Sequence, residues 1–169
     1  MGERKIPLEE LNSMRPADFV RALSGVFEGR PWIPELACSR RPFESLERLH
    51  EVLCQVVLGA DQTRKLALIR AHPELAVPPD ILTSESKSEQ KSASLDRLSS
   101  SERAEFAEIN RLYRERFGFP FVICVRQHNR KSILDNFRRR LNHSADAELS
   151  CAIDEICKIA YFRLWDLIA

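Results

Sequence analysis

The stretch SSSERAEFAEINRLYRERFG, residues 99–118, indicates the fold class more clearly than any other part of the sequence. It opens with Ser99 and Glu102, three residues apart, the spacing of a capping box in which each side chain bonds the backbone N–H of the other residue. Gly118, a residue type that commonly ends helices, closes it. Between these ends, apolar residues recur at helical spacing, at Phe106, Ile109, Leu112, Tyr113 and Phe117. The stretch therefore predicts a long amphipathic helix.

Six other segments show the same apolar periodicity and predict helices. One of them must stop at His72, because Pro73 disfavours helical backbone in the residue before it. The expected helices lie behind Pro16 up to Gly29, after Ser45 up to Gly59, from Asp61 to His72, near 86–98, around 133–141 and over 149–167.

The chain changes character between the predicted helix of residues 99–118 and the one expected around 133–141. Residues 119–125, FPFVICV, have no helical period and contain a proline, so they predict a buried extended segment. A length of 169 residues with 44% hydrophobic residues suits one globular core, and 5 Gly beside 9 Pro argue against a sheet with many tight turns. We therefore expect an all-α, single-domain compact bundle of about seven helices over residues 1–169, with residues 1–7 as a flexible N-terminus.

Charge and targeting signals narrow the partners. Lys and Arg number 26 against 25 Asp and Glu, so no overall field attracts nucleic acid. The longest apolar run, residues 119–125, is far shorter than the roughly 20 residues of a membrane span. No signal peptide is visible, the C-terminal Leu167-Ile168-Ala169 is not the peroxisomal tripeptide, and five cysteines form no C-x-x-C motif. We expect a cytoplasmic protein with reduced thiols and without nucleic-acid or membrane partners.

His72 is the most specific candidate for chemistry. The carbonyl groups at the end of a helix stabilise a histidine cation, and such a histidine can exchange protons near neutral pH. A histidine in this position also commonly serves only as a cap. The pattern alone leaves both interpretations open.

The segment Ser86-Lys87-Ser88-Glu89-Gln90 is the second candidate. On a helix, Ser86 and Glu89 lie one turn apart with Gln90 beside them, so a hydroxyl, a carboxylate and an amide can converge on one ligand. The same Ser-x-x-Glu spacing is that of a capping box, which remains an alternative. The backbone of residues 119–125 is a third candidate, because buried N–H and C=O groups outside regular structure need partners that a planar, amide-rich ligand can supply.

Arg163 interrupts the apolar stripe of the last predicted helix. A buried arginine needs an anionic partner. That partner is Glu89, another structural carboxylate, or a substrate carboxylate bound by two parallel hydrogen bonds.

Other polar motifs carry no functional prediction. Arg138-Arg139-Arg140 turn through about 100° per residue, so they form no single stripe, and a solvent-exposed face is favoured. His50, His128 and His143 lack the spacing of metal ligands, and no H-x-x-x-H, G-x-S-x-G or P-loop motif occurs. We expect no metal site.

Taken in order, a set of short motifs resembles the OHCU decarboxylase family, whose full name is 2-oxo-4-hydroxy-4-carboxy-5-ureidoimidazoline decarboxylase. The resemblance runs from about Leu8 to Leu167, and the ordered set is specific although each motif alone is weak. The motifs are LNSM at 11–14, PW at 31–32, AHPEL at 71–75, SKSEQ at 86–90, LD at 95–96, RFGFPFVIC at 116–124 and IAYFRL at 159–164.

The resemblance implies an enzyme of purine catabolism. Members of the family remove the carboxylate of this urate-derived ureidoimidazoline (OHCU) as CO2 and give (S)-allantoin, the last step from urate to allantoin. They need neither metal nor organic cofactor, are all-α and are usually homodimers. We therefore expect a cofactor-independent carboxy-lyase with one small-molecule substrate.

The resemblance also implies the roles of individual residues. His72 looks like the catalytic histidine, coupled to Glu89, and Arg163 like the active-site arginine. The implied substrate-binding residues are Pro73, Ser86, Lys87, Ser88, Glu89, Gln90, Phe121, Val122, Ile123, Cys124 and Val125. Two departures, Ser94 where many relatives have glycine and the pair Tyr161-Phe162, touch none of these roles.

A helical interaction module is the competing interpretation. In it, His72 is a cap, Ser86 and Glu89 form a capping box, and Arg163 makes a structural ion pair.

Overall fold

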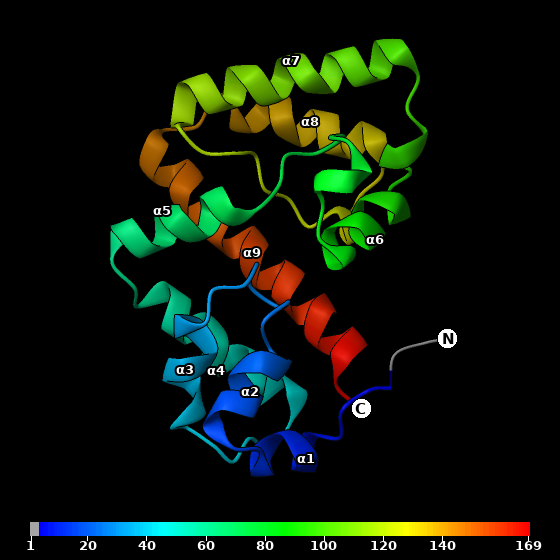
Figure 1. Ribbon diagram of the computed structural model, residues 1–169. Coiled ribbons are helices and arrows are strands. Elements are labelled where there is room, and N and C mark those ends of the chain that lie inside the picture. Colours follow the sequence, from blue (N-terminus) through cyan, green and yellow to red (C-terminus); the bar gives the residue numbers. More distant parts are fainter. Residues whose placement is uncertain (1–3) are drawn as a thin grey trace. The chain divides into compact units, whose positions relative to one another are not determined.

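A computed structural model describes residues 4–169 (Figure 1). The chain forms two compact units. One comprises the chain up to Leu68 together with Cys157–Ala169, and the other comprises Ile69–Ile156.

Helices build both units, which confirms the predicted all-α class. Over residues 4–169 there are nine α-helices and no named β-strand. Their bounds are α1 Leu8–Ser13, α2 Pro16–Ala22, α3 Trp32–Cys38, α4 Leu46–Leu58, α5 Gln62–Ala71, α6 Ser84–Ser92, α7 Ser100–Phe117, α8 Arg130–Arg140 and α9 Ala145–Leu167. Three short 3-10 helices, η1 Pro79–Ile81, η2 Leu95–Arg97 and η3 Val125–Gln127, lie between them.

All seven predicted helices are present, but that behind Pro16 is shorter than expected. Helix α2 ends at Ala22, and residues 23–29 form successive turns in which Glu28 and Gly29 have positive φ angles of 49° and 69°. Leu23, Val26 and Phe27 are nevertheless buried. The apolar spacing predicted correctly that these three residues are buried, and the turns bury them without a continuous helix.

Two helices were not predicted, α1 and α3. They have six and seven residues, too few for a periodic pattern to repeat. Helix α3 packs against α2 and α4 and adds Ile33 and Ala37 to the core of the first unit.

The N-terminal end of the described chain is held by backbone hydrogen bonds. The N–H of Ile6 donates to the Leu167 carbonyl at 2.8 Å, and the N–H of Ala169 donates to the Ile6 carbonyl at 2.9 Å. Of the flexible N-terminus expected over residues 1–7, residues 1–3 lie outside the described residues, whereas Ile6 is fixed in place.

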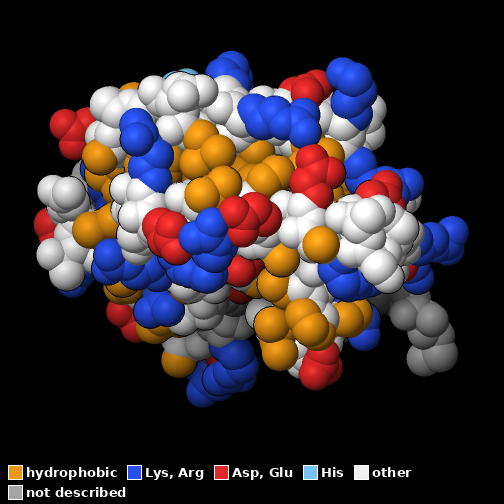
Figure 2. Space-filling model, turned by 90° about the horizontal axis from the view of Figure 1, so that it is seen from above, with side chains coloured by type: hydrophobic (Ala, Val, Ile, Leu, Met, Phe, Trp, Pro, Cys, Tyr) orange, Lys and Arg blue, Asp and Glu red, His pale blue; other side chains and the backbone are white. Residues whose placement is uncertain are grey.

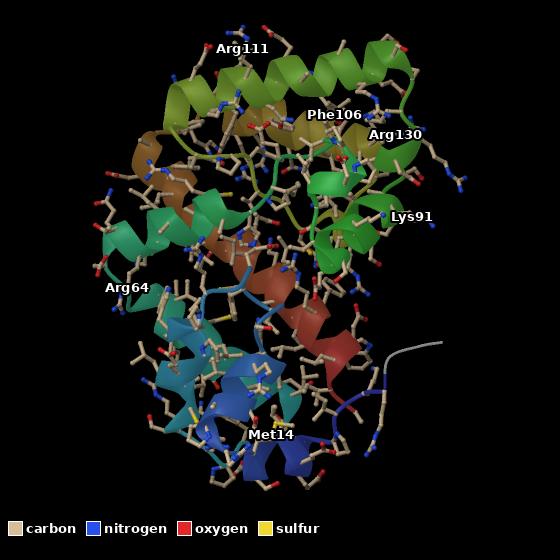
Figure 3. The ribbon with its side chains drawn as sticks, in the orientation of Figure 1. Met14, Arg64, Lys91, Phe106, Arg111 and Arg130 are labelled. Carbon is tan, nitrogen blue, oxygen red and sulfur yellow. The ribbon has the colours of Figure 1, made fainter. Side chains whose placement is uncertain are left out.

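In the second unit, α7 and α8 run side by side (Figures 1 and 3). Phe106 on α7 meets Phe137 on α8 edge to face, with ring centroids 6.5 Å apart. Arg111 extends from the outer side of α7 and pairs with Glu108 and Glu115 on the same helix. The predicted periodicity of residues 99–118 thus separates a core-facing side from an exposed one.

The helix expected near 86–98 lies earlier and is shorter. Thr83 caps α6, and the helix ends at Ser92 because Ser94 adopts the left-handed backbone conformation, φ 58°. Glycine takes this conformation without steric penalty, so Ser94 occupies a position where glycine would be less strained.

The face of the molecule that Figure 2 presents carries charges of both signs. On the face that Figure 2 presents, Lys and Arg side chains are interspersed with Asp and Glu, and the net charge of the sequence is +1. Within the described residues, no helix combines the length and the apolarity that crossing a membrane requires.

The capping box predicted at Ser99 is present, and it makes the free energy of unfolding depend on pH. The Ser99 N–H donates to the Glu102 carboxylate at 2.7 Å, and this bond, then the Ser99 hydroxyl and Arg130, lowers the pKa of Glu102. The folded pKa lies below the unfolded value of about 4.3, so the stabilisation is complete above that value and is lost as pH falls through the folded pKa. The difference in unfolding free energy between wild type and Glu102→Gln, measured by urea denaturation, should therefore narrow between pH 7 and pH 3. An unchanged difference would contradict this assignment.

Candidate active site

His72 follows the last residue of α5, as the sequence predicts. Its N–H still bonds the Ile69 carbonyl at 3.1 Å, and Pro73 then turns the chain out of the helix. The histidine is 5% exposed. The helix end therefore fixes the backbone of a buried, titratable side chain.

The loop after His72 is held by an amide from α6. Gln90 accepts a hydrogen bond from the Ala76 N–H at 2.9 Å and donates to the Glu74 carbonyl at 3.0 Å. Asn110 of α7 donates to the Leu75 carbonyl at 2.9 Å. Because Ala76 has the strained φ of 58°, these bonds also maintain a conformation that an alanine seldom adopts.

The residues of α6 divide between interior and solvent. Ser86 and Gln90 are buried, Glu89 is half-buried, and Lys87 and Ser88 are exposed. Ser86 and Gln90, four positions apart, share the inner face. The capping-box alternative for Ser86 and Glu89 is wrong, because Thr83 is the N-cap and accepts from the Ser86 N–H at 3.2 Å.

The segment predicted to be extended has no regular secondary structure over residues 120–124, so the absence of a helix there is confirmed, whereas Val125 begins the 3-10 helix η3. Phe121 and the four residues after it are all buried. Arg140 donates to the Val122 carbonyl at 2.8 Å, and the Cys124 N–H donates to Glu155 at 2.8 Å. Protein side chains thus meet part of the hydrogen-bonding need that the sequence had suggested a ligand would meet.

Ile123 lies between these two anchored residues. In a trans peptide unit the C=O and the N–H point in opposite directions. The Ile123 N–H therefore points away from the Val122 carbonyl that Arg140 holds, and the Ile123 carbonyl points away from the Cys124 N–H that Glu155 holds. This is a donor and acceptor pair of the kind that an amide-containing ligand can match.

Helix α6 and the extended segment lie close together. Helix α6 packs against η3, and the carboxylates of Glu89 and Glu155 both act on the Cys124 thiol. Burial, with the repulsion of these two charges, raises the pKa of Cys124 to about 11. The thiol is therefore protonated at neutral pH and is not poised as a nucleophile.

Arg163 lies in the other compact unit, on α9. Its guanidinium donates to Glu28 at 2.8 Å and to the Gly25 carbonyl at 2.9 Å. Of the partners left open by the sequence, the structure shows a structural carboxylate, Glu28. A role for Arg163 toward substrate stays a prediction.

Three residues of this region were missed by sequence reasoning. Asn110, Arg140 and Glu155 each hold backbone of the loop or of the extended segment. Arg140 contradicts the exposed face expected for Arg138-Arg139-Arg140, since it is 1% exposed. The available signal was its helical register, because Arg140 lies three residues after the buried Phe137.

Metal-ligating side chains do not gather anywhere in the described part of the chain. Among residues 4–169 there is no group of three or more His, Cys, Asp or Glu side chains able to hold an ion.

The fold and these contacts define an all-α protein in which a buried histidine precedes a loop that is bonded to the polar inner face of a helix. The family model for OHCU decarboxylase matches residues 12–165, and the chain belongs to that family.

Similar proteins support this assignment. The chain is 39% identical to the 2-oxo-4-hydroxy-4-carboxy-5-ureidoimidazoline decarboxylase of Haloferax volcanii over 95% of each chain. It is 35% identical to the Mus musculus protein of that name, with 94% of this chain and 91% of the relative covered. It also matches a uric acid degradation bifunctional protein of a Bacillus species at 36% identity, over 95% of this chain and 32% of the relative.

Two solved structures share the fold. An OHCU decarboxylase crystallised in the presence of (S)-allantoin superposes with a TM-score of 0.69 at 25% identity, covering 85% of this chain and 94% of the other. An (S)-allantoin synthase superposes with a TM-score of 0.79 at 24% identity, covering 97% of this chain and 54% of the other.

The Gln90 amide should be important for stability. Replacing Gln90 by Leu leaves the part-buried Ala76 N–H and Glu74 carbonyl without their partner, which should lower the free energy of unfolding by about 2 kcal/mol. Ser88→Ala, on the exposed side of the same helix, is the control and should change it by less than about 0.5 kcal/mol. Urea denaturation of both variants tests this, and equal effects would show that the amide holds nothing.

Proposed function

We propose that this chain removes the carboxylate of 2-oxo-4-hydroxy-4-carboxy-5-ureidoimidazoline as CO2 and forms (S)-allantoin, the last step from urate to allantoin. Family membership supports the activity. The observation that carries it in the structure is the placement of buried His72, whose loop is tied to α6 by Gln90, in the unit that also holds the anchored extended segment.

The reaction needs positioning more than a separate electron acceptor. When the bond between the ring carbon and the carboxylate breaks, its electron pair stays on a carbon flanked by carbonyl and imine-type groups, and the ring takes up the charge. CO2 leaves, and a proton then adds to one face of that carbon. The protein must orient the carboxylate, stabilise the developing charge and control the proton.

We assign the proton to His72, acting together with Glu89. The imidazole can exchange a proton near neutral pH, and delivery from one side determines the handedness of allantoin. Ser86, on the buried face of α6, and Pro73, beside His72, are proposed to shape the pocket.

The ring and ureido groups are proposed to bind along Phe121, Val122, Ile123, Cys124 and Val125. The backbone of Ile123 has one N–H donor and one C=O acceptor for these groups. Gln90 has a smaller part than the resemblance implies, because its carbonyl and one of its two amide hydrogens hold the loop, which leaves one donor for substrate. Lys87 and Ser88 are exposed, so any contact of theirs lies at the rim.

The interaction-module alternative requires a capping box of Ser86 and Glu89, and this box is absent because Thr83 is the N-cap of α6. Assembly as a homodimer and a cytoplasmic location are also proposed, and both rest on the sequence.

The role of His72 can be tested through the chirality of the product. His72→Asn should lower the enzymatic rate by about a hundredfold or more and remove the excess of (S)-allantoin. Circular dichroism of allantoin formed from freshly oxidised urate reports handedness, which spontaneous decay of the substrate does not supply. His128→Asn is the matched control, because its ring bonds the Ser132 hydroxyl at 3.1 Å and has no proposed part in the reaction. Full rate and handedness in His72→Asn would remove this residue from the mechanism.

Comparison of Arg163 with its partner Glu28 separates catalysis from structure. Arg163→Gln and Glu28→Gln both break one buried ion pair, so both should lower the melting temperature. If Arg163 also binds the substrate carboxylate, Arg163→Gln should reduce kcat/KM by about tenfold to a hundredfold more than Glu28→Gln does, the value of a charged hydrogen bond. Assays well below both melting temperatures decide this, and equal losses would give Arg163 a structural role alone.

A further inference from the structure

Arg140 is the third arginine of an Arg-Arg-Arg run, and it points into the core. Arg138 and Arg139 are exposed, whereas Arg140 is 1% exposed. Its guanidinium donates hydrogen bonds to two separate groups. Nε donates to Glu148 at 2.6 Å, and Nη1 donates to the Val122 carbonyl at 2.8 Å.

Glu148 holds the guanidinium in one orientation. This carboxylate is fully buried and also accepts from the Tyr113 hydroxyl at 2.5 Å, while His143 Nδ1 lies 3.1 Å from its second oxygen. Nη2 of Arg140 makes a further ion pair with Glu148. A buried charge pair tolerates little departure from good geometry, because each ion has given up its water.

Arg140 also contacts the side chain that precedes Val122. Its guanidinium carbon lies 4.3 Å from the centroid of the Phe121 ring, a cation–π contact. Phe137 stacks on the same ring with a centroid distance of 3.7 Å, and Tyr113 meets it edge to face at 5.4 Å. One arginine therefore holds both the ring of Phe121 and the backbone of Val122.

We infer that Arg140 is a positioning residue for the reaction. By fixing Phe121 and Val122 from the protein side, it keeps the Ile123 N–H, which points away from the Val122 carbonyl, turned toward the substrate. This inference rests on the proposed function, because it gives the segment a substrate to meet. It also explains why a charge pair occupies the core at this place, where apolar residues of similar volume would pack as well.

The planar guanidinium is required for this role. Its donors point in fixed, divergent directions, so one group reaches a carboxylate and a carbonyl together. A lysine ammonium in the same place keeps the charge beside Glu148 but has neither the fork nor the flat face.

The deciding experiment removes the anchor without leaving a buried charge. The double variant Arg140→Met/Glu148→Leu replaces both ions by apolar side chains and should fold. Arg139→Met, one position away and exposed, is the matched control. We expect the double variant to raise the Kd for (S)-allantoin and the KM of the decarboxylation by at least about tenfold, since a displacement of about 1 Å costs up to a hundredfold. The control should stay within about twofold of wild type, as for a surface substitution.

Arg140→Lys is the second variant, in case the double variant does not fold. A purely structural role predicts a lower melting temperature with unchanged Kd and KM well below it. Positioning predicts that both constants rise. Wild-type values in either folded variant would overturn the inference.

Hydrogen exchange separates this inference from the proposed function. Amides of residues 121–125 should exchange at least about tenfold faster in both variants, whatever the reaction is, because local opening sets this rate. Unchanged exchange would show that Arg140 does not order the segment. Absence of an (S)-allantoin excess with the wild-type protein would instead contradict the proposed function.

Discussion

Buried backbone outside helices and sheets must find hydrogen-bond partners elsewhere, and the candidate site is arranged around this requirement. The loop after His72 has its polar groups met by Gln90 and Asn110. The extended segment has Val122 and Cys124 met by Arg140 and Glu155. Side chains from neighbouring helices thus do for these segments what a regular ladder does for a strand. They thereby fix the backbone of both segments.

The sequence was sufficient for the helices that depend on local rules. The capping pair Ser99 and Glu102 opens α7, and Gly118, with φ 76°, closes it. The Asp61 carboxylate caps α5 by accepting from the Arg64 N–H at 2.8 Å. The His72-Pro73 stop also lies where expected. These features involve atoms a few residues apart, so their energetics can be read from spacing alone.

Partner choice could not be read in this way. Arg163 was expected to need an anion, but Glu28 is 135 residues distant and lies in a turn that periodicity had assigned to a helix. Arg140 was placed on an exposed face because neighbouring charges suggested solvent. The Gln90 amide is expected from the sequence to bind substrate, but its carbonyl oxygen and one of its N–H groups bond the loop after His72. In each case a contact with a residue distant in the sequence determines the role of the side chain.

The pairing of Ile6 with Leu167 and Ala169 has a consequence for longer proteins that contain this domain. The chain matches 32% of a bifunctional relative from Bacillus, so the same architecture occurs as part of a fusion. Because the two ends of the described chain are bonded to each other, an additional domain joined at either end would emerge at the same place. A fusion partner is therefore presented to the same patch of surface whichever order the two domains take along the gene.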